Sequence, residues 1–489
     1  MIWVSTPTSQ QRSQMLLSTS SLIESGFQQL LPVELPPRVR PQGEQISPAR
    51  PAGPAKGAST LGWGLLSRLC PPELVDRVLR EQDRQEQRVR LLPARLVVYG
   101  LLLMSMGGDL SYAKLMHHLG GLAGAARNWG AANKSAFVRA RLRLGWEVME
   151  QLFRALARPL GDADRDDCCF WRGLRVVSLD GTTFELPRNR ELETAFGGQR
   201  ANDGTHRRVG APLARVVMLV ECGTRALLDV TVGAYCLGEN TLARQLSGLG
   251  PGMLVLADRG FPSKPLWEAY SRTGADLLWR AKSSIARRNL RWLPDGTYLV
   301  SFGKRKPSTV RVIEYRIRGS KEIYRLLTTL LDPASANALE LAQLYSQRWE
   351  HETLVRELKS DLCRSGRLRS QTEMGVRQEL WATLIVHTLA RQLAYQAASE
   401  IPERDPDRIS FSLVKDTIRR SIGRLTVVGR RALDLAISEL TKLPNLLTRR
   451  LRSCPRAAYK RASGYRNRSL LETPPSAPRP PIEILLDAA

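Results

Sequence analysis

Four polar side chains near residue 350 fall on one stripe of a predicted helix. On a helix that turns by about 100° per residue, Tyr345, Arg348, Glu352 and Lys359 lie within about 60° of one another. A carboxylate flanked by cations suits the cutting of a phosphate backbone, because the acid can hold a metal ion while the cations hold the phosphates. The alternative is a set of ordinary surface ion pairs, each worth only tenths of a kcal/mol.

The same helix carries a separate apolar face. Leu344, Leu354, Leu358 and Leu362 recur at helical spacing on the side away from the polar stripe. We therefore expect the helix to pack into a core on one side and to present the polar stripe on the other.

Two aspartates come directly after buried, strand-like runs. Asp180 ends the run 174–179 and is followed by Gly181, while Asp258 ends the run 253–257 and is followed two residues later by Gly260. Each glycine would allow a tight exit from its strand. Taken singly, an Asp-Gly turn or a loop acid explains each aspartate. Together with Glu352, however, the two aspartates form a set of three carboxylates that can bind two divalent cations about 3.5–4 Å apart.

The elements that would position these acids follow a recognisable order. Three strands, a helix, a strand, a helix and a further strand form an α/β unit with the order of the ribonuclease H-like fold. The predicted strands are 174–179, 213–220, 226–234, 253–257 and 275–280, and the predicted helices between them are 240–246 and 264–272.

Other segments flank this catalytic core. Strand-like runs between residues 284 and 331 predict a β-rich insertion ahead of the helix that carries Glu352. The predicted organisation is a disordered tail (1–57), a helical DNA-binding domain (58–165), a ribonuclease H-like catalytic domain (170–400), a basic helical region (401–470) and a Pro-rich tail (471–489).

Composition narrows the class of partner. The 489 residues include 73 Lys+Arg against 47 Asp+Glu, which gives a formal net charge of +26. Such a charge favours a polyanion, with nucleic acid ahead of an anionic membrane surface, since no long basic amphipathic helix is present. Seven scattered cysteines without a CxxC pair indicate neither a disulfide framework nor a zinc site.

These motifs together resemble those of the IS4-family DDE transposases. The resemblance is carried by residues 257–261 (ADRGF), by the Y-x2-R-x3-E-x6-K spacing from Tyr345 to Lys359, and by residues 180–182 (DGT), and it covers about residues 61–443. It implies that Asp180, Asp258 and Glu352 are catalytic and bind two Mg²⁺ ions, with Mn²⁺ as a substitute.

The resemblance also implies contacts with DNA. Tyr345, Arg348 and Lys359 would contact phosphates of the transposon end, and Tyr324, with Trp292 as second choice, would stack on a flipped base. Packing of Tyr324 within the β-rich insertion is the alternative. The expected partners are double-stranded DNA, as terminal inverted repeats and target, and a second copy of the chain on paired ends. No membrane partner is expected, and the expected location is the bacterial cytoplasm, at the nucleoid.

The implied reaction is cut-and-paste transposition by metal-assisted phosphoryl transfer, through strand cleavage, hairpin formation and strand transfer. Two other functions share the charge and the fold. One is a domesticated or regulatory DNA-binding protein without catalysis, which would tolerate loss of the acids. The other is a ribonuclease H-like nuclease that cleaves strands without joining them.

Overall fold

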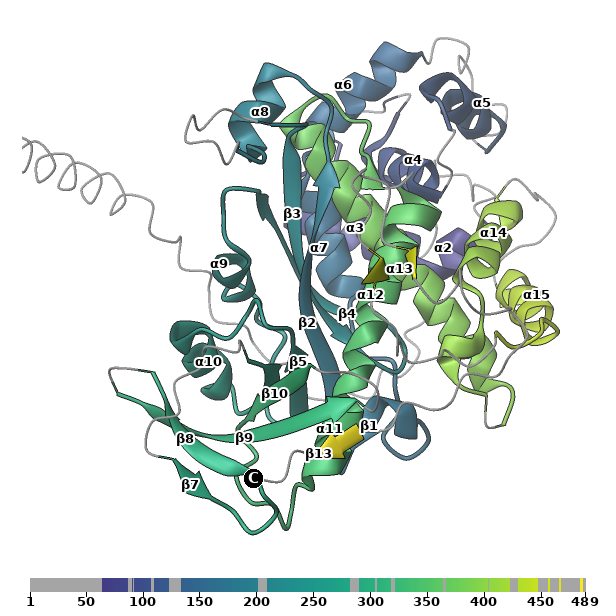
Figure 1. Cartoon of the computed structure of the whole chain (residues 1–489). Helices are drawn as coiled ribbons and strands as arrows, with labels where there is room; N and C mark the ends of the chain where they lie inside the picture. Colours follow the sequence, from purple (N-terminus) through teal and green to yellow (C-terminus); the bar gives the residue numbers. More distant parts are fainter. Residues whose placement is uncertain are drawn as a thin grey trace, which may run out of the picture. The chain divides into compact units, whose positions relative to one another are not determined.

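A computed structural model of the chain (Figure 1) describes a single compact unit within Ser59–Ala489. The predicted tail at 1–57 lies outside the described residues. The described residues are 64–86, 90, 92–106, 110–122, 133–200, 209–281, 290–303, 306–317, 322–363, 366–402, 404–422, 430–446, 456–457, 466–467 and 484–486.

A mixed sheet forms the centre of the unit, and its strands lie in the order β4-β3-β2-β5-β6-β10-β9-β8-β7. The pairs β2–β3 and β3–β4 are antiparallel, whereas β5 lies parallel to both β2 and β6. The five core strands therefore follow the ribonuclease H-like order, as predicted. The strands are β1 (Phe170–Trp171), β2 (Leu174–Glu185), β3 (Leu213–Glu221), β4 (Leu227–Ala234), β5 (Met253–Ala257), β6 (Asp276–Arg280), β7 (Arg291–Trp292), β8 (Tyr298–Phe302), β9 (Ser308–Ile317), β10 (Ile323–Thr328), β11 (Arg456–Ala457), β12 (Arg466–Asn467) and β13 (Ile484–Leu486).

The β-rich insertion continues the central sheet. Its last strand, β10, pairs antiparallel with β6, and β9 and β8 follow outward from β10. The C-terminal strand β13 pairs with the end of β9, at residues that β8 does not reach. Part of the segment predicted as a Pro-rich tail thus belongs to the sheet.

The two faces of the sheet pack against different helices because successive strand residues point to opposite sides. Val177 and Leu179 belong to a core shared with α9 (Glu239–Ala243) and α10 (Lys264–Ser271). Val176 lies on the other face, in a core shared with α11 (Ala338–Leu344). By the same alternation, Asp180 faces the side of α11.

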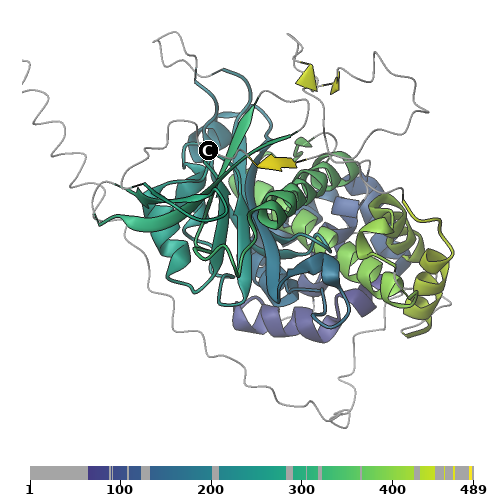
Figure 2. The same cartoon turned by 60° about the horizontal axis from the view of Figure 1, so that its bottom comes forward.

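The helical regions before and after the sheet share one hydrophobic core, which joins α4 and α7 to the long, buried helix α13. Figure 1 shows α13 beside the central strands and the N-terminal helices, and in the turned view of Figure 2 the helices again gather on one side of the sheet. The boundary near residue 165 stays a prediction. The helices of these regions are α2 (Leu65–Leu69), α3 (Pro72–Glu81), α4 (Ala94–Met106), α5 (Tyr112–Leu122), α6 (Lys134–Leu144), α7 (Glu147–Leu156), α8 (Arg190–Phe196), α13 (Glu373–Ser399), α14 (Phe411–Ser421) and α15 (Arg430–Thr441), with short turns η3 (Asp167–Cys169) and η7 (Pro406–Arg408).

Candidate active site

Strands β2 and β5 bring the two aspartates side by side. Leu179 pairs with Ala257 in parallel register, so Asp180 and Asp258 are the next residue on each strand. The predicted strand end at Asp180 is wrong, however, because β2 continues to Glu185 against β3. The alternation of buried Thr182 and Phe184 with more exposed neighbours shows why the chain stays extended.

Each aspartate is fixed by a main-chain amide close by in sequence. The amide of Gly181 donates to Oδ1 of Asp180 at 2.8 Å, and the amide of Gly260 donates to Oδ1 of Asp258 at 2.7 Å. Burial raises the pKa of Asp180 to about 7, and the nearby carboxylate of Asp258 adds to this rise while Arg348 opposes it. A cation placed here would therefore be stabilised by the carboxyl groups around it.

The helix that carries Glu352 is not the uniform α-helix that the polar stripe assumes. After α11 the chain makes a 3₁₀ segment, η4 (Tyr345–Arg348), then α12 (Trp349–Arg356), and then a π-helical segment, η5 (Glu357–Leu362). The apolar face is confirmed, since all four of its leucines are buried: Leu344, Leu354, Leu358 and Leu362. Leu344 joins the core under α11, whereas the other three join the core around α13.

Three side chains at spacings of three residues tie this run to the strands that bear the aspartates. The hydroxyl of Tyr345 donates to the carbonyl of Ala257 at 3.1 Å, directly before Asp258. Arg348 donates to Oδ2 of Asp180 at 3.0 Å. Nδ1 of His351 lies 3.1 Å from the hydroxyl of Ser178 on β2.

His351 is a functional candidate that the sequence analysis missed. It is fully buried, and burial lowers its pKa to about 3, which keeps the ring neutral. The sequence did contain a signal for His351, because it follows Arg348 by three residues, just as Arg348 follows Tyr345. Tyr345 itself is buried and its hydroxyl donates to the main chain, and its predicted phosphate contact stays a prediction.

Lys359 lies on the π-helical segment, beside β2. Its ammonium is 5.8 Å from the centre of the Phe184 ring, and burial lowers its pKa. Gly366 has a positive φ of 82°, and a Cβ there would lie 3.2 Å from the Lys359 side chain, so the glycine leaves space for the lysine.

The two aromatic candidates of the insertion differ in environment. The ring of Tyr324 stacks on Tyr315 at 5.2 Å, and the guanidinium of Arg280 lies 4.3 Å from its centre. Trp292 is 49% exposed and makes an edge contact with Tyr298 at 5.0 Å. The packing alternative therefore describes Tyr324, and Trp292 is the more accessible ring.

Arg348 stands between two of the three acids. Its Nη1 is 3.0 Å from Asp180, and its Nη2 is 3.6 Å from Glu352. In the described part of the chain, no three His, Cys, Asp or Glu side chains approach one another closely enough to enclose a metal ion. The donor types nevertheless fit a divalent cation, since Asp180 and Glu352 both direct carboxylate oxygens at the Arg348 guanidinium, which now supplies the positive charge.

Known protein families match both the N-terminal helical region of the chain and the region that carries the three acids. The family described as Insertion element 4 transposase N-terminal matches residues 61–154, and the family described as Transposase DDE domain matches residues 171–389. Transposase InsG for insertion sequence element IS4 from Escherichia coli (strain K12) is 29% identical over 420 residues, which are 81% of this chain and 91% of that protein. This chain belongs to the IS4 family of DDE transposases.

Two further similarities accompany this one. The putative transposase InsZ from the same Escherichia coli strain is 26% identical over 264 residues, covering 53% of this chain and 82% of its own. The cryo-EM structure of the piggyBac transposase synaptic complex with hairpin DNA aligns with 81% of this chain and 89% of its own, at 12% identity and a TM-score of 0.40.

The family places this transposase among DNA-cleaving enzymes that depend on divalent metal ions and bind DNA. The six cysteines in the described residues are free thiols. None of the helices that the structure describes has the length and apolar character needed to cross a membrane.

Behind the active site, a buried ionic network holds the helix that carries Glu352. Arg225, at the turn between β3 and β4, contacts Glu350 at 2.5 Å, Glu357 at 3.4 Å and Asp407 at 3.0 Å. Arg391 of α13 also pairs with Glu357. Although burial alone would raise the pKa of Glu357, these cations hold it well below its usual range. The sequence analysis missed this network because its members lie far apart in the chain.

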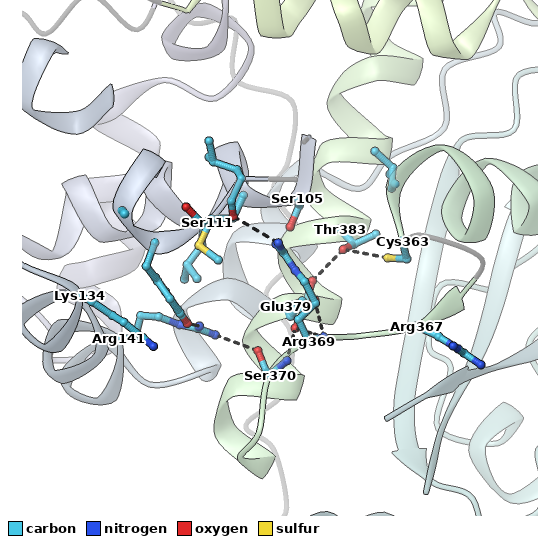
Figure 3. Close-up of a pocket in the computed structure, with 16 residues that line it drawn as sticks. Ser105, Ser111, Lys134, Arg141, Cys363, Arg367, Arg369, Ser370, Glu379 and Thr383 are labelled. Carbon is cyan, nitrogen blue, oxygen red and sulfur yellow. Dashed lines mark hydrogen bonds and ion pairs between the residues drawn. The ribbon is translucent and has the colours of Figure 1, made fainter. Parts of the chain in front are cut away.

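A cavity of about 390 Å³ lies between the N-terminal helices and the start of α13 (Figure 3). The buried guanidinium of Arg141 bridges the two sides through Tyr112, Gln378 and the carbonyl of Gly375. Its bonds to Gln378 and Gly375 therefore join the N-terminal helices to α13, and none of the three predicted acids lines this cavity.

Proposed function

We propose that the chain is the transposase of an insertion sequence and moves it by a cut-and-paste route at terminal inverted repeats. The observation that supports this proposal is that Asp180 and Asp258 directly follow the parallel pair Leu179 and Ala257, with Glu352 linked to Asp180 through Arg348. In this proposal the three carboxylates hold two Mg²⁺ ions, which Mn²⁺ can replace. When bound, such ions activate the attacking oxygen and stabilise the leaving oxygen of an in-line displacement at phosphorus.

The residues of the chain then act on the DNA itself. Arg348 and Lys359 hold phosphates of the transposon end, and Tyr345 and His351 keep the catalytic helix in register with β5 and β2. Water attacks the end phosphate and releases a 3′-hydroxyl. That hydroxyl attacks the opposite strand to close a hairpin, a second water reopens it, and the 3′ ends join target DNA. Two ends must be paired, so a homodimer on DNA is part of the proposal.

Trp292 is the aromatic side chain that this proposal places against an unstacked base during hairpin formation. Its exposed ring leaves a face available for stacking, which contributes about 1–3 kcal/mol per base. Tyr324 already stacks on Tyr315. Trp292→Ala should therefore reduce the hairpin product without abolishing the first cut, and Tyr324→Ala should change it less. The opposite ranking would return the role to Tyr324.

An excision assay tests the proposal. The duplex end of the element that encodes the chain is incubated with the protein and Mg²⁺, and the nicked, hairpin and joined products are separated on a gel. Asp258→Ala should abolish all products and leave binding of the end intact. Asp434→Ala, on the exposed side of α15, is the matched control and should retain activity.

The products also separate the alternatives. A regulatory DNA-binding protein would give binding without any product, and a nuclease would give cut strands without joined ones. Full activity in Asp258→Ala would remove this residue from the metal site.

A further inference from the structure

Arg348 is a largely buried arginine held by two acids of the candidate active site. Its side chain is 12% exposed, and its polar contacts are with two carboxylates, Asp180 on β2 and Glu352 on α12. The remaining contact is with the ring of Trp349, 5.6 Å from the guanidinium. Its two polar partners are therefore both acids to which the proposed function gives a metal ion.

Two other buried arginines of the described chain are anchored to main-chain carbonyls. Arg141 donates to the carbonyl of Gly375, and Arg311 donates to the carbonyl of Ala336. A guanidinium bonded to main chain cannot leave without exposing a carbonyl that has lost its donor. Among the described residues, Arg348 makes no such bond, so its release from them requires that another cation take over the two carboxylates.

A metal ion and the guanidinium compete for the same oxygens. Oδ2 of Asp180 and Oε1 of Glu352 accept the contacts of Arg348, and both carboxylates belong to the proposed ligand set. A divalent cation and a guanidinium repel each other strongly at such distances. Occupation of the acid site by one therefore disfavours the other.

We propose that Arg348 closes the acid site of the free transposase and opens it by transferring its guanidinium to a DNA phosphate. The proposal rests on the proposed function, through its assignment of Asp180 and Glu352 as metal ligands. Binding of the transposon end and binding of the metal then support each other, because each removes a competitor of the other. Coupling of this kind is reciprocal. Arg348 acts as a positioning residue that links end recognition to metal loading.

The test measures metal binding without DNA and without catalysis. Mn²⁺ is titrated into the full chain, and unbound Mn²⁺ is followed by electron paramagnetic resonance at about pH 8.5, where protons compete less for carboxylates. Arg348→Gln should bind Mn²⁺ about tenfold more tightly than the wild type. Arg348→Lys keeps the positive charge and should stay near the wild type.

Arg377→Gln is the matched control, since it removes an arginine that also pairs with a carboxylate one helical turn away, Glu373 at 2.9 Å on α13. It should leave Mn²⁺ affinity unchanged. Equal affinity in Arg348→Gln and the wild type would overturn the proposal, as would an equal gain in Arg377→Gln. Circular dichroism of each variant checks that the fold is retained.

Two further arms separate this inference from the proposed function. Asp258→Ala combined with Arg348→Gln should lose the tight Mn²⁺ site; retention of the site would refute the ligand assignment itself. Addition of a pre-cleaved duplex end should tighten Mn²⁺ binding by the wild type about tenfold and leave Arg348→Gln nearly unaffected. A wild type that does not respond to the duplex would refute the coupling and leave the ligand assignment standing.

Discussion

Glu357→Gln should destabilise the transposase through the buried ionic network. The Glu357 side chain is 1% exposed and lies between two arginines, Arg225 at 3.4 Å and Arg391, while Nε2 of His387 is 3.1 Å from its carboxylate. The amide would keep the shape of the side chain and remove its charge. Two buried guanidinium groups would then lose a shared counter-charge.

The expected size follows from the burial. Removing one partner of a buried ion pair costs about 3–5 kcal/mol of unfolding free energy. For a unit of this size, each kcal/mol lowers the melting temperature by roughly 2 °C, so we expect a fall of about 6–10 °C. The pKa of Glu357 is held below its usual range, so this stabilisation is present above about pH 4 and is lost as pH falls further.

Thermal melts of the wild type and two variants measure the effect. Glu340→Gln is the control, because the same substitution there breaks an exposed pair with Arg172, in which the side chains are 44% and 43% exposed. An exposed pair contributes less than about 1 kcal/mol. If Glu357→Gln lowers the melting temperature no more than Glu340→Gln does, the buried network does not stabilise the fold as argued.

Three other predictions concern the catalytic helix. Tyr345→Phe removes the hydroxyl bonded to Ala257, so strand cleavage should slow and stability should fall by about 1 kcal/mol, while the salt dependence of end binding stays the same; a flatter salt slope would restore the phosphate contact. Lys359→Ala should reduce the salt slope of end binding by about 1, and an unchanged slope would exclude a phosphate contact. His351 stays neutral in the fold with a pKa of about 3, so its own contribution to the free energy of unfolding should fall by about 1.4 kcal/mol between pH 7.5 and 5.5, as the unfolded chain takes up a proton. In urea titrations at pH 7.5 and 5.5, His351→Asn should lose less over this interval, and an equal loss would refute the assignment.

The order of the core strands was predictable because each strand is a short buried run between turn residues. The helix with Glu352 was predictable in its two faces, since helical spacing alone separates its leucines from its polar residues. The internal geometry of this helix was not predictable. A change from 3₁₀ to α and then to π winding does not alter the hydrophobic periodicity detectably in so short a segment.

Contacts between residues far apart in the chain could not be predicted from the sequence. Arg225 meets Glu350 and Asp407 only once the sheet, the catalytic helix and the C-terminal region have assembled. The length of β2 was accessible in principle, since Thr182 and Phe184 continue a strand pattern beyond Asp180. The sequence analysis ends the strand at Asp180 with a tight exit at Gly181, whereas pairing with β3 keeps the chain extended to Glu185.

The C-terminal strand β13 has a practical consequence for anyone who attaches a reporter or an affinity tag to this enzyme. β13 occupies an edge of β9 and lies beside α11, the helix that leads directly into the catalytic run. A bulky group fused just after Leu486 competes with this pairing, and displacement of β13 leaves unpaired main-chain groups at the edge of β9 that other chains can join.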